Sequence, residues 1–283
     1  MDYLYCVCDL DGTVLDSLDR ISNENLNAFK LLGESGIKLV VATGRSHLLI
    51  KEYLYDMDIK TPVIACNGGL ILDNSSGEII YKKLIPQELV KSIINFCGER
   101  QIEYLLYTTD TVFHNRNNKR IEKFIKYSTA ARDEFKIPIQ IIEDADKGNI
   151  IQSTIKILIT TGSFSLMEEL SLLFNKDDEL TIVSSMNGLI DIMASNTTKG
   201  NALTYLAEFM GMDLEKTVVF GDNYNDISMF EVAGMGIAVE NAEEELKNVA
   251  TYVTLSNEES GVGYAINKYV LSGVWLTNFS LSL

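Results

Sequence analysis

The chain has 283 residues, of which 46% are hydrophobic and 23% charged, a composition typical of globular proteins with one large or two moderate domains. Its 24 basic and 40 acidic residues give a net charge of −16. The sequence contains no basic stripe, so we expect neither a nucleic acid nor an anionic membrane surface as a partner.

The N-terminus shows no basic segment followed by a long apolar one, so no secretory leader is expected. The tail from Val270 to Leu283 is shorter than the ~20 residues of a membrane span and is expected to pack on the fold or fray. The four cysteines form no C-x-x-C pair, and we interpret them as buried free thiols. These features predict a cytoplasmic protein.

The first third of the chain alternates between short apolar runs and helical segments. Ser22 is expected to cap a helix that buries Phe29 and Leu32 on one face. The three predicted strands cover residues 3–8, 37–42 and 63–66, and each ends in small polar residues. Strands that alternate with helices in this way predict a parallel sheet.

The last third repeats the pattern. A helix through Leu203 is expected to end at Gly211, and Asn241 is expected to cap a later helix. The predicted strands here are 217–220 and 236–239, with helices around Met229 and over 262–269.

The middle of the chain, from 84 to 186, has a different pattern. Pro86 opens a predicted helix, and further helices are expected at 119–131 and 165–174. Predicted strands at 103–108, 111–115, 155–160 and 180–184 are joined by short turns in places, which favours an antiparallel α+β domain. We therefore predict a core formed by 1–83 and 187–283, with 84–186 inserted into it.

Four polar clusters follow predicted strands or open predicted helices. They are Asp9-Leu10-Asp11-Gly12-Thr13, Thr43-Gly44-Arg45, Lys199-Gly200 and Gly221-Asp222-Asn223-Tyr224-Asn225-Asp226. Each cluster alone is also compatible with an ordinary turn or helix start, but loops of a parallel sheet gather at one edge. A calcium-binding EF-hand is excluded, because Val14 and Arg20 would occupy its glycine and glutamate positions. No G-x-G-x-x-G follows a strand and no G-K-[ST] is present, which excludes dinucleotide and P-loop sites.

These four clusters, in this order, resemble the motifs of the haloacid dehalogenase superfamily, and more narrowly of its Cof-type phosphatases. The resemblance covers nearly the whole chain. It implies an α/β fold with a Rossmann-like parallel-sheet core and a large inserted α+β cap between the second and third motifs.

The residue types suit phosphoryl transfer, which requires an in-line nucleophile, neutralised phosphate oxygens and a proton for the leaving oxygen. We predict Asp9 as the nucleophile that forms an aspartyl-phosphate. Asp11 would protonate the leaving alcohol and then deprotonate water. Its ordinary pKa, near ~3.9, is too low for this role, so neighbouring carboxylates are expected to raise it.

So many carboxylates require a cation before an anionic phosphate can approach, and hard oxygen ligands point to Mg²⁺. By resemblance, Asp9, Asp222 and the main-chain carbonyl of Asp11 are metal ligands, while Asp226 orients the metal's waters. Lys199 supplies positive charge to the nucleophile and the transferring group, and Thr43 donates a hydrogen bond to phosphate.

The remaining candidates for phosphate or substrate binding are Leu10, Gly44, Arg45, Asn67, Gly68 and Asn225. The Asn67-Gly68 turn either faces the substrate or is a plain turn, and Arg45 either binds substrate phosphate or forms a surface ion pair. His47 is assigned no role. His114 and Arg116 are interpreted as parts of a solvated turn.

The sequence therefore predicts a Mg²⁺-dependent phosphatase for small phosphate monoesters, such as sugar phosphates or phosphorylated cofactors. Two alternatives stay open: a phosphomannomutase-like phosphotransferase, and a non-catalytic regulatory protein that binds a phosphorylated ligand. The oligomeric state is not predicted.

Overall fold

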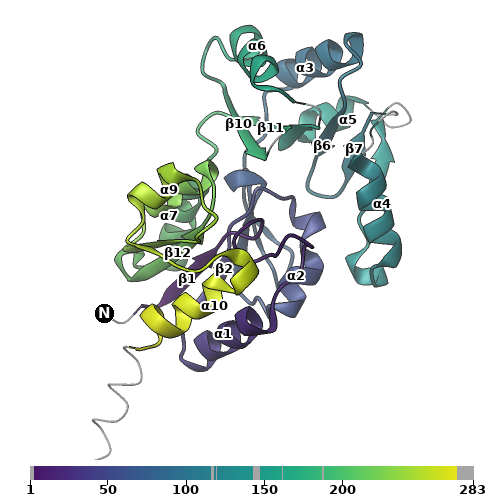
Figure 1. Cartoon of the computed structure of the whole chain (residues 1–283). Coiled ribbons are helices and arrows are strands. Elements are labelled where there is room, and N and C mark those ends of the chain that lie inside the picture. The colour runs from purple at the N-terminus through teal and green to yellow at the C-terminus, as the bar shows by residue number, and fades with distance from the viewer. Residues whose placement is uncertain are drawn as a thin grey trace, which may run out of the picture. The chain divides into compact units, whose positions relative to one another are not determined.

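A computed structural model describes residues 3–115, 118, 120–142, 147–160, 162–186 and 188–272 (Figure 1). The chain divides into two compact units, and each is described by itself. The first comprises Met1–Gly44, Glu52–Ile80 and Thr198–Leu283, and the second comprises Arg45–Lys51 and Tyr81–Thr197. Arg116 and the end of the tail, from 273 onward, lie outside the described residues.

The first unit is built around a five-stranded parallel sheet with strand order β14-β13-β12-β1-β2. Its strands are β1 (Tyr5–Cys8), β2 (Lys38–Val41), β12 (Thr217–Gly221), β13 (Met235–Ala238) and β14 (Tyr252–Val253). Its helices are α1 (Asn23–Glu34), α2 (Lys51–Asp56), α7 (Lys199–Met210), α8 (Ile227–Phe230), α9 (Glu244–Val249) and α10 (Gly261–Ala265), which continues as a π-helix over Ile266–Val270. Strand β1 lies between β12 and β2, and all four of its residues are buried.

Local sequence signals set the ends of two helices as predicted. The Ser22 side chain accepts a hydrogen bond from the backbone N–H of Asn25 and so caps α1. Helix α7 ends at Gly211, whose φ of 67° lies in the left-handed region that glycine tolerates best. In Figure 1, α1 lies beside α10, and the two helices pack against each other.

The third predicted strand departs from the parallel sheet. Strand β3 (Pro62–Ala65) contacts the parallel sheet through a bridge between Ala42 and Ile64, but it pairs antiparallel with β4 (Leu70–Asp73). With β5 (Ile79–Lys82), these strands form a separate three-stranded sheet. The turn at Cys66–Gly68 thus ends β3 as predicted, and the chain then reverses into a hairpin that the sequence analysis did not include.

The second unit contains a six-stranded sheet with order β10-β11-β9-β6-β7-β8. All its pairs are antiparallel except β7 with β8. The strands are β6 (Tyr104–Tyr107), β7 (Val112–His114), β8 (Ile139–Ile141), β9 (Lys156–Ile159), β10 (Leu180–Met186) and β11 (Leu189–Ala194). The helices are α3 (Gln87–Glu99), α4 (Arg120–Ala130), α5 (Lys147–Ser153) and α6 (Phe164–Phe174).

One apolar cluster holds this second unit together. Residues of α3, α5 and α6, including Val90, Ile150 and Leu170, pack with the strand residues Leu106 and Ile157. The predicted fold class, a parallel α/β core with an inserted α+β part, is confirmed.

Two further observations concern the cysteines and the helices. All four cysteines are buried and free, as expected. In the part of the chain that the structure describes, no helix combines the length and the apolar character needed to cross a membrane.

Candidate active site

The parallel pairing of β1 with β12 brings two acidic loops together. Asp9 follows β1 directly, and its backbone N–H donates to the carbonyl of Phe220 on β12 at 3.1 Å. Asp222 follows β12, and both carboxyl groups therefore lie at the same edge of the sheet.

The turn after Asp9 is closely fitted to Asp222. The buried Leu10 offers its carbonyl to the backbone N–H groups of Val14 and Leu15, at 3.0 and 2.9 Å. Gly12 has a φ of +74°, and a Cβ placed on it would lie 2.4 Å from a carboxylate oxygen of Asp222. A residue without a side chain is therefore required here. The Thr13 hydroxyl donates to the other oxygen of Asp222 at 2.9 Å.

Lys199 joins the two acidic loops through its ammonium group. It is the first residue of α7, and its side chain is fully buried. Its Nζ lies 2.6 Å from Oδ1 of Asp9 and 2.6 Å from Oδ1 of Asp226. A buried lysine with two carboxylate partners has its charge compensated.

Asp226 stabilises the loop after β12 by accepting hydrogen bonds from its backbone. While Oδ1 accepts from Lys199, its Oδ2 accepts from the backbone N–H groups of Asp222 and Asn223, both at 3.0 Å. Both oxygens of Asp226 are thus held in place, and the backbone at Asp222 is held with them.

The electrostatics of the cluster are unbalanced. Burial raises the pKa of Asp9 to about 7; Lys199 opposes the rise, while the charges of Asp226 and Asp11 add to it. Burial also raises the pKa of Asp222 to about 9, together with repulsion from Asp9 and Asp226. Burial would lower the pKa of Lys199, but attraction to Asp226 and Asp9 outweighs it and raises that pKa. The single ammonium of Lys199 does not balance the charge of these three carboxylates.

The donor set suits a hard divalent cation. Oxygen atoms of Asp9, Asp222 and Asp226 all lie within 4.8 Å of one another. Carboxylate oxygens are the ligands that Mg²⁺ prefers, and a divalent charge would offset their repulsion. The carboxylate of Asp11 is not part of this group.

The phosphate-binding candidates gather at the same edge. Thr43 donates its backbone N–H to Ile64, and Asn67 donates its own to the Thr43 carbonyl at 3.0 Å. Asn225 Nδ2 donates to Asn67 Oδ1 at 2.9 Å. A Cβ on Gly44 would lie 2.9 Å from that same oxygen, which again explains a glycine. One on Gly68 would lie 2.4 Å from the Thr198 carbonyl, next to Lys199.

The candidate Arg45 and two histidines considered in the sequence analysis lie in the second unit. Arg45 and His47 belong to its short segment Arg45–Lys51. His114 ends β7 and is buried, so its interpretation as part of a solvated turn is wrong. Burial and the charge of Lys51 lower the pKa of His47 to about 4, so this imidazole is neutral near pH 7.

Sequence reasoning missed two contacts of the first unit that hold the site. One is the Thr13 hydroxyl on Asp222, and the other is the Ser228 hydroxyl, which accepts the backbone N–H of Gly200 at 3.0 Å. Thr13 lies inside the first cluster, so its position there was a usable signal. Ser228 carries no local signal, because its partner lies 28 residues away.

Comparison with known proteins places the chain in a family. Residues 6–266 match the family model described as haloacid dehalogenase-like hydrolase. The chain is 34% identical to the 5-amino-6-(5-phospho-D-ribitylamino)uracil phosphatase YwtE of Bacillus subtilis, covering 94% of this chain and 97% of that protein. It is 25% identical to the pyridoxal phosphate phosphatase YbhA of Escherichia coli, covering 93% and 97% of the two chains.

A solved structure agrees with these relatives. The crystal structure of a haloacid dehalogenase-like hydrolase from Bacteroides thetaiotaomicron is 27% identical, covers 94% of this chain and 99% of its own, and superposes with a TM-score of 0.82. The match to the family model, the named relatives and the shared fold lead to one conclusion. The chain belongs to the haloacid dehalogenase-like hydrolases, in their Cof-type group of phosphatases.

Proposed function

We propose that this chain is a Mg²⁺-dependent phosphatase that hydrolyses small phosphate monoesters through an aspartyl-phosphate. The observation that supports this most directly is the group formed by the buried Asp9, Asp226 and Lys199 and the half-buried Asp222. It combines a nucleophile at a strand end, a fixed positive charge and an oxygen donor set for a cation.

Asp9 is the proposed nucleophile. Its carboxylate oxygen attacks phosphorus, a new P–O bond forms, and the bond from phosphorus to the leaving oxygen breaks. Asp11 gives its proton to that leaving oxygen, so the alcohol departs neutral. Asp11 then takes a proton from water, which attacks the phosphoryl group and returns Asp9 as a free carboxylate.

The proposed ligands for Mg²⁺ are the carboxylates of Asp9 and Asp222 and the backbone carbonyl of Asp11, with Asp226 orienting the metal's waters. When bound, the ion supplies positive charge that offsets the carboxylates and the phosphate oxygens. Lys199 adds its own charge to Asp9 and to the transferring group.

Neighbouring residues are proposed to hold the phosphate and the rest of the substrate. Thr43 donates its hydroxyl hydrogen, and the backbone at Leu10 and Gly44 completes the cradle. The other residues proposed to bind phosphate or substrate are Arg45, Asn67, Gly68 and Asn225. The inserted segment, 84–186 in the sequence prediction, is proposed as the cap that selects the leaving group.

The substrate class is a small phosphorylated metabolite. Two of the relatives are named for 5-amino-6-(5-phospho-D-ribitylamino)uracil and for pyridoxal phosphate, so these two esters are the first to test here. A cytoplasmic location is part of the proposal and rests on the sequence features given above.

The decisive experiment uses a panel of phosphorylated metabolites and an aryl phosphate, assayed with Mg²⁺ and with EDTA. Wild type should release phosphate only with Mg²⁺, and Asp9→Asn should release none while keeping the fold. Asp177→Asn, which makes the same change at an exposed position of the second unit, is the matched control and should behave as wild type. Undiminished turnover in EDTA or in Asp9→Asn would reject the proposal. Conversion of a hexose 1-phosphate to the 6-phosphate, without free phosphate, would favour the phosphotransferase alternative.

A further inference from the structure

The segment after β13 touches both acidic loops of the site. Asn241 Nδ2 donates to the carbonyl of Gly12 at 2.8 Å. Two residues later, the backbone N–H of Glu243 donates to the carbonyl of Asp222 at 2.8 Å. One short stretch of chain thus holds the turn after Asp9 and the loop after β12.

Asn241 also reaches a third element. Its Oδ1 accepts the backbone N–H of Asn257 at 2.9 Å. The side-chain amide of Asn257 in turn donates to the carbonyl of Leu15 at 2.8 Å. The carbonyl of Gly12 requires a donor and the N–H of Asn257 requires an acceptor, so these partners fix the orientation of the Asn241 amide.

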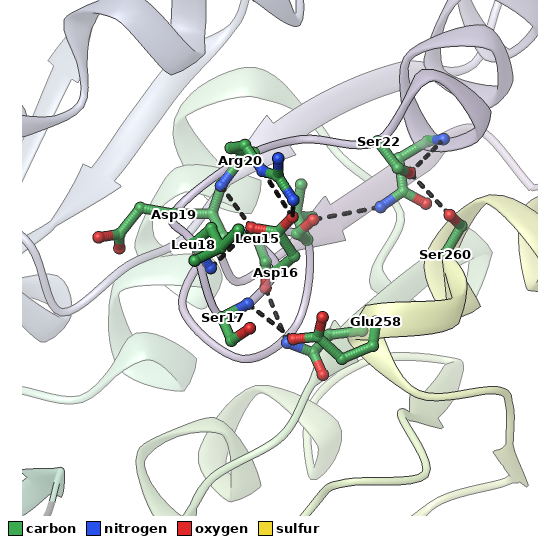
Figure 2. A network of polar contacts seen from close by, with 12 residues as sticks. Leu15, Asp16, Ser17, Leu18, Asp19, Arg20, Ser22, Glu258 and Ser260 are labelled. Carbon is green, nitrogen blue, oxygen red and sulfur yellow. Dashed lines mark hydrogen bonds and ion pairs between the residues drawn. The ribbon is translucent and has the colours of Figure 1, made fainter.

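The residues just after Asn257 also contact the loop from Asp16 to Ser22, which follows this turn, as Figure 2 shows. Glu258 accepts the backbone N–H of Ser17 at 2.7 Å, and the hydroxyl of Ser260 donates to that of Ser22 at 2.8 Å. Within the loop, Asp16 pairs with Arg20 at 2.8 Å. Among these contacts, the one made by Asn241 is to Gly12, the residue whose backbone lies against Asp222.

The position of the Gly12 turn matters for the site. At Gly12 the backbone passes so close to Asp222 that no Cβ fits, and the next residue, Thr13, donates its hydroxyl to the same carboxylate. A shift of the Gly12 carbonyl therefore moves the chain on which the Asp222 carboxylate rests, together with the neighbouring Asp11.

We propose that Asn241 is a positioning residue of the proposed phosphatase reaction. Its amide fixes the Asp11–Thr13 turn against Asp222 and so sets the geometry in which the acidic group takes up Mg²⁺. Asparagine suits the position because its side chain donates and accepts at once, over the short reach between two backbone groups. This inference depends on the proposed function for its catalytic consequence.

The test compares the full chain as wild type, Asn241→Ala and Asn241→Asp. Asn241 is exposed, so its replacement leaves the core intact. The Asp variant keeps the oxygen that accepts from Asn257 and removes the N–H that donates to Gly12. The matched control is Asn248→Ala, at an exposed position of α9.

Two readouts decide the question. The first is hydrogen exchange of the Val14 and Leu15 amides in the metal-free protein, since both donate to Leu10 within this turn. The second is the Mg²⁺ concentration that gives half-maximal hydrolysis of p-nitrophenyl phosphate. Both Asn241 variants should exchange faster and should need on the order of 10-fold more Mg²⁺, with an unchanged KM for the ester. Asn248→Ala should match wild type in both readouts.

Three results would overturn the inference. The first is wild-type Mg²⁺ dependence and exchange in Asn241→Ala. The second is a wild-type response of Asn241→Asp, which would show that the bond to Gly12 is not the one that matters. The third is a rise in KM alone. If wild type releases no phosphate, the proposed function fails, while the exchange measurement, made without metal or substrate, still decides whether Asn241 holds the turn.

Discussion

Replacing Gly200 with alanine tests whether helix packing positions Lys199, the proposed catalytic lysine. A Cβ at Gly200 would lie 2.0 Å from the carbonyl oxygen of Ser228 and 2.4 Å from its carbonyl carbon. Ordinary contact begins at 3.4 Å, so the gap must open by about 1.4 Å, the difference between 3.4 and 2.0 Å. Because the opposing atoms are backbone, α7 itself has to move away from α8.

That movement carries Lys199 with it. Lys199 precedes Gly200 in α7 and lies 2.6 Å from both Asp9 and Asp226, so a displacement of this size breaks its contacts. Overpacking of this kind costs roughly 1–3 kcal/mol of stability. A misplacement of about 1 Å in a catalytic group costs on the order of 10²-fold in turnover.

The assay pairs the urea midpoint, followed by circular dichroism, with kcat on p-nitrophenyl phosphate. The midpoint is the appropriate measure because a chain with two compact units need not unfold in one transition. The matched control is Gly33→Ala, at an exposed position of α1 where the new methyl group meets open space. It should keep full turnover, and its free energy of unfolding should rise by about 0.5–1 kcal/mol, since glycine destabilises helices. A Gly200→Ala variant with the midpoint and kcat of wild type would refute the reasoning.

Three further predictions concern charge. Lys199→Met should lower kcat by roughly 10²–10³, and turnover within tenfold of wild type would count against its role. In EDTA, Asp9 keeps its proton to about pH 7 and Asp222 to about pH 9 in the folded protein, whereas both ionise near pH 3.8 in the unfolded chain. Between these pH values the folded protein binds more protons than the unfolded chain, so the melting temperature should fall as the pH rises from 3.8 to about 9. Stabilisation by Mg²⁺ should therefore be larger at about pH 8 than at about pH 5; Asp222→Asn should reduce this difference, and an equal effect at both pH values would contradict the prediction. In the second unit, Lys156 and Asp191 form a buried ion pair of 2.7 Å, so Lys156→Met should destabilise by about 3–5 kcal/mol, as measured by thermal unfolding. Combining Lys156→Met with Asp191→Leu should cost less than Lys156→Met alone, because no buried charge is then left unpaired; equal losses would show that the two charges are not coupled.

The parts of the fold that the sequence predicted are those that local chemistry determines. The buried run before Asp9 is a strand because four apolar residues precede a polar turn, and α1 begins where Ser22 can cap it. The approach of Asp9 to Asp222 also followed from the rule that parallel strands present their carboxyl ends at one edge, because β1 and β12 are parallel neighbours.

What the sequence analysis missed depends on partners far away in the chain. Strand β11 is buried along its whole length, yet Asp191 lies at its centre and interrupts the apolar pattern. That carboxylate is tolerated because Lys156, on the neighbouring strand β9, pairs with it. No local signal announces such a pairing.

Asn241 illustrates the same limit. Its position before an expected helix favoured a cap, and that prediction was wrong. Helix α9 begins at Glu244 with Glu243 at its cap position. The side chain of Asn241 bonds instead to Gly12, 229 residues away. A short polar side chain can satisfy a helix end or a distant carbonyl, and only the tertiary fold decides between them.

The central place of β1 has a consequence for synthesis on the ribosome. Its residues 5–8 pair on one side with residues 217–220, which emerge more than 200 residues later. At ~5–20 residues per second, the apolar edge of β1 waits roughly 10–40 s for β12. The inserted strands β6 to β11 meet their partners within one continuous stretch of chain, so they can fold during that interval. In a nascent polypeptide, β1 is therefore enclosed only after β12 has been made, and until then it is exposed to aggregation or chaperone binding.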